Sequence, residues 1–203
     1  MSYLEEFCEA LRGQKFLVLD TETTGLQEGE ICEIAIINSE WETLLNTRVK
    51  TKLPIPKEAT AIHGINDALV NDCLQWPEIQ EIVLGLTKSQ NVIVYNAVYD
   101  RRMMHQSDRL WGLMPAAYKE QSSYFCCMEA YAEFYGAWNS FRGSYTWQSL
   151  AKAFKLVTRQ EHEGAHSALK DCHATLAVTR FLLNKEHIFD ERDMPLDTKG
   201  IDF

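Results

Sequence analysis

Two acidic side chains near the start of the sequence stand at a spacing that suits metal binding. Asp20 and Glu22 flank a single threonine, and residues two apart in an extended chain face the same side. Two carboxylates held this close repel each other, and a shared cation relieves the repulsion. Hard oxygen ligands favour Mg²⁺ or Mn²⁺ over zinc. The pair predicts a divalent-metal site, although a lone pair of this kind is also explained by a solvated turn.

A third carboxylate follows a later apolar run. Asp100 comes five residues after the β-favouring run Val92–Tyr95, at the predicted opening of the next helix. Asn96 lies between them and is placed either to cap that helix or to support the site from behind. Taken alone, Asp100 is equally well explained as a capping residue.

The string from His166 to Asp171 supplies an imidazole and a fourth carboxylate. Ser167 is a natural helix N-cap, which puts Asp171 in the first helical turn and His166 in the loop before it. From a loop, the imidazole can reach the carboxylates, and a group that titrates near pH ~6.5 suits a general base. His162 and His173 lack this placement and are interpreted as surface residues.

The elements around these residues alternate between strands and helices. Strands are expected over residues 16–20, 30–38, 43–50 and 92–95. Helices are expected over 3–11, 58–62, 77–86, 98–111, 128–138, 147–154 and 167–183. An antiparallel meander followed by strands interleaved with helices indicates an α/β fold, with a mixed sheet and helices on its faces.

Composition predicts one ordinary globular domain over residues 1–203, with an acidic tail over 185–203. The chain has 203 residues, a net charge of −9 and 46% hydrophobic residues, which excludes a disordered or coiled-coil protein. No apolar run approaches the ~20 residues of a membrane span, and the amino terminus does not read as a signal peptide. The six cysteines are interpreted as free thiols, and a cytoplasmic location is expected.

Four strings in fixed order, FLVLDTETTGL, AIHGI, VIVYNAVYD and HSALKD, together resemble the exonuclease motifs of the DnaQ-like superfamily. The resemblance covers about residues 16–183. Its spacings are D-x-E and H-x4-D; a sister subfamily has tyrosine where this chain has Ser167, four residues before Asp171. The sequence is therefore identified as a member of the histidine-containing DEDDh subfamily.

The resemblance implies a ribonuclease H-like fold, with a five-stranded mixed sheet flanked by helices. It also implies a 3′-to-5′ exonuclease that uses two Mg²⁺ or Mn²⁺ ions on 3′ ends of single-stranded nucleic acid and releases nucleoside monophosphates. By resemblance, Asp20 bridges both ions, Glu22 and Asp171 complete the first site, Asp100 supports the second through water, and His166 is the general base.

The resemblance also implies contacts with the terminal nucleotide. Thr23 matches a position whose main chain contacts the 3′-hydroxyl. Leu26 matches a position that forms an apolar lid on the base, and Ile65 one whose side chain is wedged against the last base. Asn96 is expected on the substrate side of the site. Turn and core-packing roles remain open for these positions.

Basic and aromatic residues elsewhere are candidates for phosphate contacts and base stacking. The basic ones are Arg101, Arg102, Lys152, Lys155 and Arg159. The aromatic ones are Tyr124, Trp138, Tyr145 and Trp147. Two other functions stay open: a proofreading subunit of a polymerase, and a catalytically silent nucleic-acid-binding protein on the same fold. The sequence leaves DNA or RNA undecided and is compatible with a homodimer.

Overall fold

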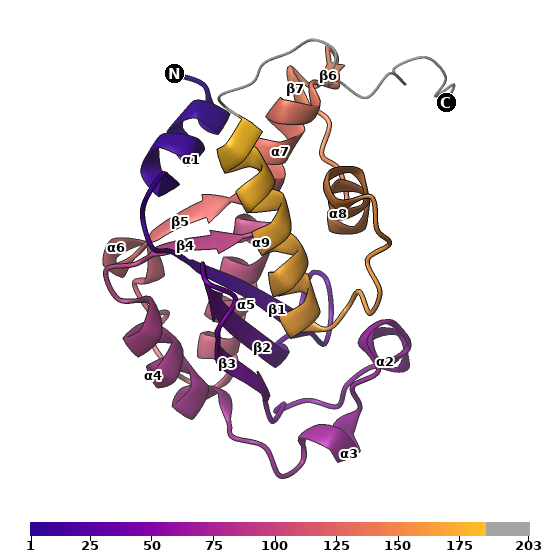
Figure 1. The fold of residues 1–203 in the computed structure, drawn as a ribbon. Coiled ribbons are helices and arrows are strands. Elements are labelled where there is room, and N and C mark those ends of the chain that lie inside the picture. The colour runs from indigo at the N-terminus through magenta and orange to yellow at the C-terminus, as the bar shows by residue number, and fades with distance from the viewer. Residues whose placement is uncertain (186–203) are drawn as a thin grey trace.

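A computed structural model describes residues 1–185 of the chain. Its main sheet has five strands in the order β3-β2-β1-β4-β5 (Figure 1). The strands of this sheet are β1 (Leu17–Thr23), β2 (Ile31–Asn38), β3 (Thr43–Arg48), β4 (Asn91–Val94) and β5 (Ser123–Cys126). A separate two-stranded ribbon is formed by β6 (Trp138–Asn139) and β7 (Ser144–Tyr145). The mixed five-stranded sheet confirms the expected fold class.

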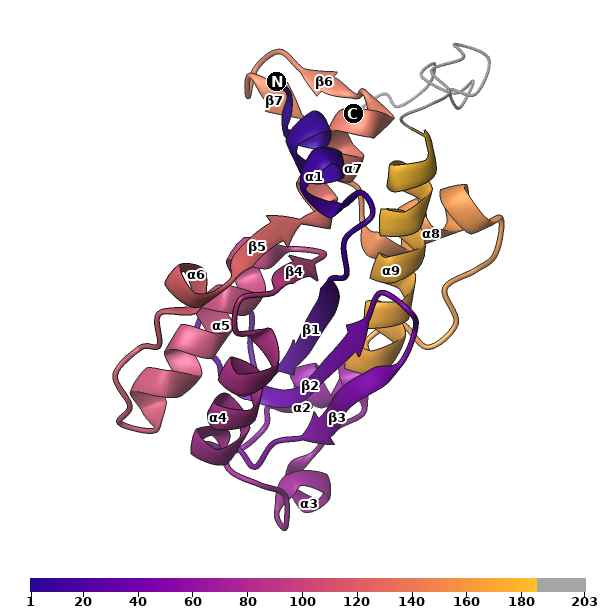
Figure 2. The ribbon, with the colours of Figure 1, turned by 60° about the vertical axis from the view of Figure 1, so that its left-hand side comes forward.

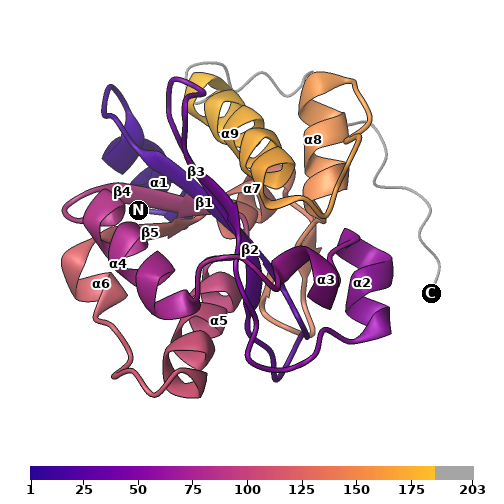
Figure 3. The same cartoon turned by 90° about the horizontal axis from the view of Figure 1, so that it is seen from below.

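Helices cover both faces of this sheet. They are α1 (Tyr3–Leu11), α2 (Lys57–His63), α3 (Asp67–Val70), α4 (Trp76–Thr87), α5 (Ala97–Leu110), α6 (Tyr118–Gln121), α7 (Cys127–Tyr135), α8 (Leu150–Thr158) and α9 (Ala168–Lys185). Helices α5 and α9 both contact β1 and β2 and lie on opposite sides of the sheet, with α4 beside α5 and α8 beside α9 (Figure 3). The central strand β1 is therefore enclosed between two helical layers.

The expected antiparallel meander is formed by β1, β2 and β3. Strand β1 pairs antiparallel with β2 and parallel with β4. It runs through Thr23, so Asp20 and Glu22 lie inside the strand rather than at its end. A register irregularity lies between Glu22 and Thr23, and an irregularity of this kind bends a strand locally.

A buried carboxylate joins the helices on the α5 side. Asp108 is fully buried and accepts hydrogen bonds from Trp76 Nε1 at 2.7 Å, Gln80 Nε2 at 2.7 Å and the Tyr118 hydroxyl at 3.1 Å. A buried charge is tolerated when donors surround it. This network ties α4 and α6 to α5, the helix that carries Asp100.

Two predicted helix boundaries were wrong for local reasons. The helix expected over 128–138 ends at Tyr135, because Gly136 adopts a left-handed conformation (φ 76°) and terminates it. The helix expected over 147–154 begins at Leu150, where the Ser149 side chain accepts from Lys152 N. The stretch from 112 to 144 also contains β5, which no sequence pattern indicated.

The structure bears on the predictions about cysteines, membrane spans and the acidic tail. All six cysteines are free thiols; Cys126 ends β5 and Cys127 begins α7. Among the described residues, no helix is both long and apolar enough to cross a membrane. The predicted acidic tail falls almost wholly outside the described residues. The molecule viewed from another side is shown in Figure 2.

Candidate active site

The predicted carboxylates converge on one cavity of about 650 Å³ at the ends of β1 and β4. Its lining comes from β1 and the loop after it, from α2, from the start of α5 and from the segment that opens α9. The lining residues that the sequence singled out are Asp20, Glu22, Thr23, Leu26, Asn96, Asp100, His166 and Asp171. Motifs far apart in the sequence therefore form one site.

Two of the four carboxylates are buried, and the other two, Asp20 and Asp171, are half-buried. Glu22 is 8% exposed and Asp100 is 4% exposed. Burial, reinforced by repulsion from Asp171 and other nearby carboxylates, raises the pKa of Glu22 to about 8. Burial and the charges of Asp100 and Asp171 raise the pKa of Asp20 well above its ordinary value. The cluster is thus strongly destabilised when all members are ionised without a cation.

Asp100 is held by β1, the strand that carries Asp20 and Glu22. Burial raises its pKa to about 7, and hydrogen bonds from Thr21 oppose that rise. The Thr21 backbone N–H and hydroxyl both donate to Asp100 Oδ1. No sequence pattern indicated this role of Thr21, because a threonine between two acidic residues is typical of an ordinary strand.

The loop before α9 brings His166 beside the carboxylates. His166 is exposed and has a left-handed backbone (φ 68°), and its N–H donates to Asp171 Oδ2 at 3.1 Å. Ligand atoms of Glu22, His166 and Asp171 all lie within 4.8 Å of one another. The first N–H of α9, that of Ala168, donates to Glu33 Oε2 at 2.9 Å. Glu33 lies opposite Glu22 in the register of β1 and β2. A carboxylate from the sheet therefore fixes the first residue of α9.

His162 corrects the sequence interpretation. It was expected to be a surface residue, but its side chain is only 5% exposed, and its Nε2 forms a short contact with Asp171 Oδ1. The ring of His162 also packs on Phe154 of α8, with centroids 5.3 Å apart. The tertiary contact between α8 and the loop buries it, and no local pattern reports such a contact.

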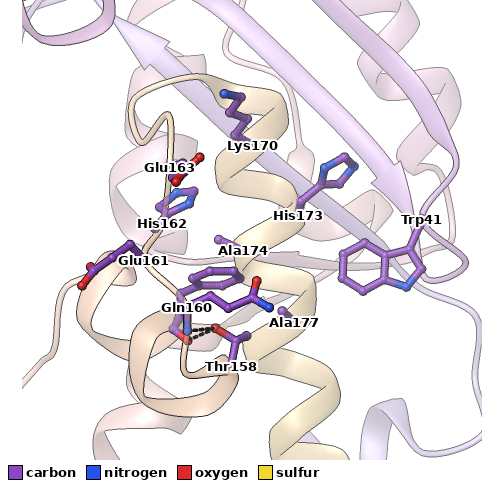
Figure 4. A pocket seen from close by; sticks show the side chains of 11 residues that line it. Trp41, Thr158, Gln160, Glu161, His162, Glu163, Lys170, His173, Ala174 and Ala177 are labelled. Atoms are coloured by element: carbon purple, nitrogen blue, oxygen red, sulfur yellow. Dashed lines mark hydrogen bonds between the residues drawn. The ribbon is translucent and has the colours of Figure 1, made fainter.

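His162 separates the site from a second cavity of about 870 Å³. Figure 4 shows His162 on one side of this cavity and Trp41 with His173 on another. The rings of Trp41 and His173 lie 5.8 Å apart, so His173 is partly covered rather than a free surface residue. Its Nε2 is buried with no partner among the described residues.

The loop after β1 forms the outer wall of the first cavity. Leu26 is 75% exposed at its rim, and Arg102 Nη2 donates to the Leu26 carbonyl at 2.7 Å. The Thr23 hydroxyl lies 2.6 Å from the Tyr99 hydroxyl. Helix α5 therefore holds this loop in place and leaves the Leu26 side chain free to touch a ligand.

One of the expected substrate-side residues, Ile65, does not line the cavity. Ile65 is 2% exposed and packs in a small core with Cys32 and Ile55; Ile62 and His63 of α2 line the cavity instead. Ile65 is buried because the glycine that ends α2 turns the chain inward. Asn96 lines the cavity and stands at the N-cap of α5 without a side-chain capping bond.

The donor set fits divalent metal ions. Among the described residues, no Lys, Arg or His forms an ion pair with Asp20, Glu22 or Asp100. Carboxylate oxygens at this density suit Mg²⁺ or Mn²⁺, and a cation would offset the repulsion that raises their pKa values.

Comparison with known proteins places these motifs in a family. The exonuclease family model RNase_T matches residues 17–179. An uncharacterized exonuclease of Escherichia phage 186 is 41% identical over 173 residues, which cover 80% of this chain and 84% of that protein.

Two solved structures are similar to the whole fold. Exonuclease X in complex with 5′-overhanging duplex DNA has 26% identity and a TM-score of 0.57, covering 87% of this chain and 95% of that one. Zinc-bound Escherichia coli exonuclease I with single-stranded DNA has 18% identity and a TM-score of 0.68. The match covers 86% of this chain and 41% of that one, so this chain spans about two fifths of its length. The chain belongs to the RNase T exonuclease family, and it is a DnaQ-like enzyme of the DEDDh type with a ribonuclease H-like fold.

Proposed function

We propose that this exonuclease removes nucleoside monophosphates from the 3′ end of single-stranded DNA with the help of two divalent ions. The observation that carries the proposal is the convergence of four carboxylates and His166 on a cavity whose rim is the exposed Leu26. Similarity to exonuclease X, whose solved complex contains DNA, favours DNA over RNA.

Each residue at the site has a role in this proposal. Asp20, Glu22 and Asp171 hold one ion, and Asp20 and Asp100 support the second. A pair of such ions stabilises the charge on the attacking and leaving oxygens of an in-line displacement. His166 accepts the proton of the attacking water.

The remaining residues orient the substrate. The backbone at Thr23 receives the 3′-hydroxyl, and Leu26 covers the terminal base. Because α5 fixes the loop between them, the last nucleotide enters an already formed pocket. A preformed pocket reduces the entropy cost of aligning the scissile bond.

A matched set of substrates tests the proposal. A 5′-labelled DNA strand should shorten stepwise from its 3′ end with Mg²⁺ or Mn²⁺ and stay intact in EDTA. A closed circular single strand and a 3′-blocked strand should resist digestion. Asp20→Asn is the matched inactive control. Nicking of the circle would identify an endonuclease, and faster digestion of a matched RNA strand would reassign the substrate.

A further inference from the structure

One segment differs in charge from the rest of this acidic chain. The chain carries 29 acidic residues, yet residues 134–160 contain none. The same segment contains the basic residues Arg142, Lys152, Lys155 and Arg159. Lys155 forms an ion pair with Glu161; among the described residues, no carboxylate pairs with Arg142 or Lys152. A positive segment on a chain of net charge −9 is suited to phosphate groups.

The same segment exposes large aromatic side chains. Trp138 is 58% exposed, Phe141 98% and Trp147 61%. Clustered exposed apolar groups mark binding sites, and aromatic faces that stack on bases are typical of single-strand recognition. We call Trp138, Phe141, Arg142, Trp147 and Lys152 the aromatic hairpin surface.

Hydrogen bonds and a ring contact brace the hairpin that carries Trp138 and Phe141. Asn139 Oδ1 accepts from the N–H groups of Phe141 and Arg142, both at 3.0 Å. Across the two strands, Trp138 packs edge-on against Tyr145 with centroids 5.1 Å apart. Figures 1 and 2 show the hairpin beside α7 at one end of the molecule. Its rings face solvent on a fixed scaffold, so they can bind a strand at low entropic cost.

A short segment of chain links the hairpin to the catalytic cavity. Leu150 lines that cavity and follows Trp147 by three residues. The chain between them is anchored because the Tyr95 hydroxyl donates to the Gln148 carbonyl at 2.9 Å. Tyr95 lines the same cavity. The anchored segment from Trp147 to Leu150 therefore joins the hairpin to the wall of the cavity.

We propose that the aromatic hairpin surface binds the single strand of nucleic acid on the 5′ side of the nucleotide held in the cavity. The proposal rests on the exonuclease function proposed above. The aromatic rings of this surface stack on bases, and Arg142 and Lys152 contact phosphates. The surface thus gives affinity for longer strands, whereas the cavity recognises the terminal nucleotide.

Binding and cleavage are measured on substrates of different length. Fluorescence anisotropy in EDTA gives the affinity for DNA strands of about 4 and about 16 nucleotides, a span that matches typical single-strand sites. Hydrolysis of the p-nitrophenyl ester of thymidine 5′-monophosphate reports on the cavity alone. The variants are Phe141→Ala, Trp147→Ala and Arg142→Gln; the matched controls are the exposed Met114→Ala and Lys119→Gln, which lie outside the segment.

Loss of either ring should weaken binding of the longer strand at least about fivefold. Binding of the shorter strand and ester hydrolysis should not change. Arg142→Gln should reduce the salt dependence of binding by about 0.7 in log–log slope, the value for one phosphate of a single strand. Because Phe141 is 98% exposed, its removal should leave the thermal unfolding temperature unchanged.

The proposal is overturned if both ring variants bind the longer strand like the wild type, or if they weaken both strands equally. It is also overturned if sedimentation shows a wild-type dimer that Phe141→Ala dissociates, since the surface would then belong to a second copy of the chain. Absence of ester hydrolysis by the wild type would count against the catalytic proposal. The proposal for the aromatic hairpin surface would still be tested by comparing the affinities of the variants for the longer and the shorter strand.

Discussion

Thr21 donates two hydrogen bonds to one oxygen of Asp100. Its backbone N–H lies 3.1 Å and its hydroxyl 2.7 Å from Oδ1. Both donors come from the residue between Asp20 and Glu22, so the strand that carries one pair of carboxylates also orients a third. Donors to a carboxylate favour its ionised form, which is the form that binds a cation.

Thr21→Val should lower activity and metal affinity by about 10- to 100-fold, the usual cost of losing a partner that orients a metal ligand. The change keeps the shape of the side chain and the backbone bond but removes the hydroxyl. Steady-state kinetics with a Mg²⁺ titration measures it. Thr21→Ser retains the donor and is the control. Full activity of Thr21→Val would show that the backbone bond alone orients Asp100.

Stability of the metal-free protein should fall as the pH rises from about 4 to about 8. Burial raises the pKa values of Glu22 and Asp100 to about 8 and about 7, whereas in the unfolded chain they return to about 4. Within that window the folded protein binds more protons than the unfolded chain, so the free energy of unfolding decreases with pH.

Urea unfolding in EDTA at several pH values measures this slope. Glu22→Gln should flatten it, because the substituted side chain does not titrate. Added Mg²⁺ should raise stability most at the alkaline end, where the carboxylates are ionised. A wild-type slope equal to that of Glu22→Gln would contradict the assignment.

Asp20→Asn should abolish cleavage and remove most of the thermal stabilisation given by Mg²⁺. In EDTA the variant should be at least as stable as the wild type, because one repelling charge is absent. Scanning calorimetry with and without Mg²⁺ separates these effects. An equal Mg²⁺ shift in both proteins would place the ion elsewhere.

His166→Ala should reduce kcat by about 10²–10⁴-fold, the usual contribution of a general base. Mg²⁺ affinity should change little, because the four carboxylates remain. Single-turnover kinetics and a metal titration give the two quantities. Combined loss of activity and metal binding would make His166 a ligand rather than a base.

His162→Ala should also reduce activity, in contrast to what its sequence context predicts. Its ring bonds Asp171 and packs on Phe154, so its removal frees the carboxylate and the loop that carries His166. Kinetics should show a reduced kcat, and His173→Ala, whose ring faces the second cavity (Figure 4), is the control. Equal effects of the two variants would indicate a general loss of packing.

The sequence predicted the features of this site that depend on where a residue stands within its own strand or helix. Asp20, Glu22, Asp100 and Asp171 lie at fixed positions within their elements, and the alternation of strands with helices brings those elements together. Helix α1 was predicted at its observed bounds, because its amphipathic pattern is complete within nine residues.

Features that depend on tertiary contact were missed. His162 is covered by α8, and Glu33 reaches the first N–H of α9 from β2; both contacts join residues whose sequence neighbours give no indication of them. Ile65 was expected at the substrate, but the turn after α2 directs it into a core. Strand β5 (SYFC) lacks the run of β-branched residues that marks β4 (NVIV), although both have four residues.

The left-handed backbone of His166 has a consequence for how this enzyme balances stability against function. A residue other than glycine pays roughly 1–2 kcal/mol to adopt that conformation, and glycine adopts it freely. His166→Gly should therefore be more stable than His166→Ala and at least as stable as the wild type, yet as inactive as the alanine variant. The histidine lies where the fold alone would favour glycine. Its imidazole raises the catalytic rate, whereas a glycine would raise the free energy of unfolding by relaxing the loop.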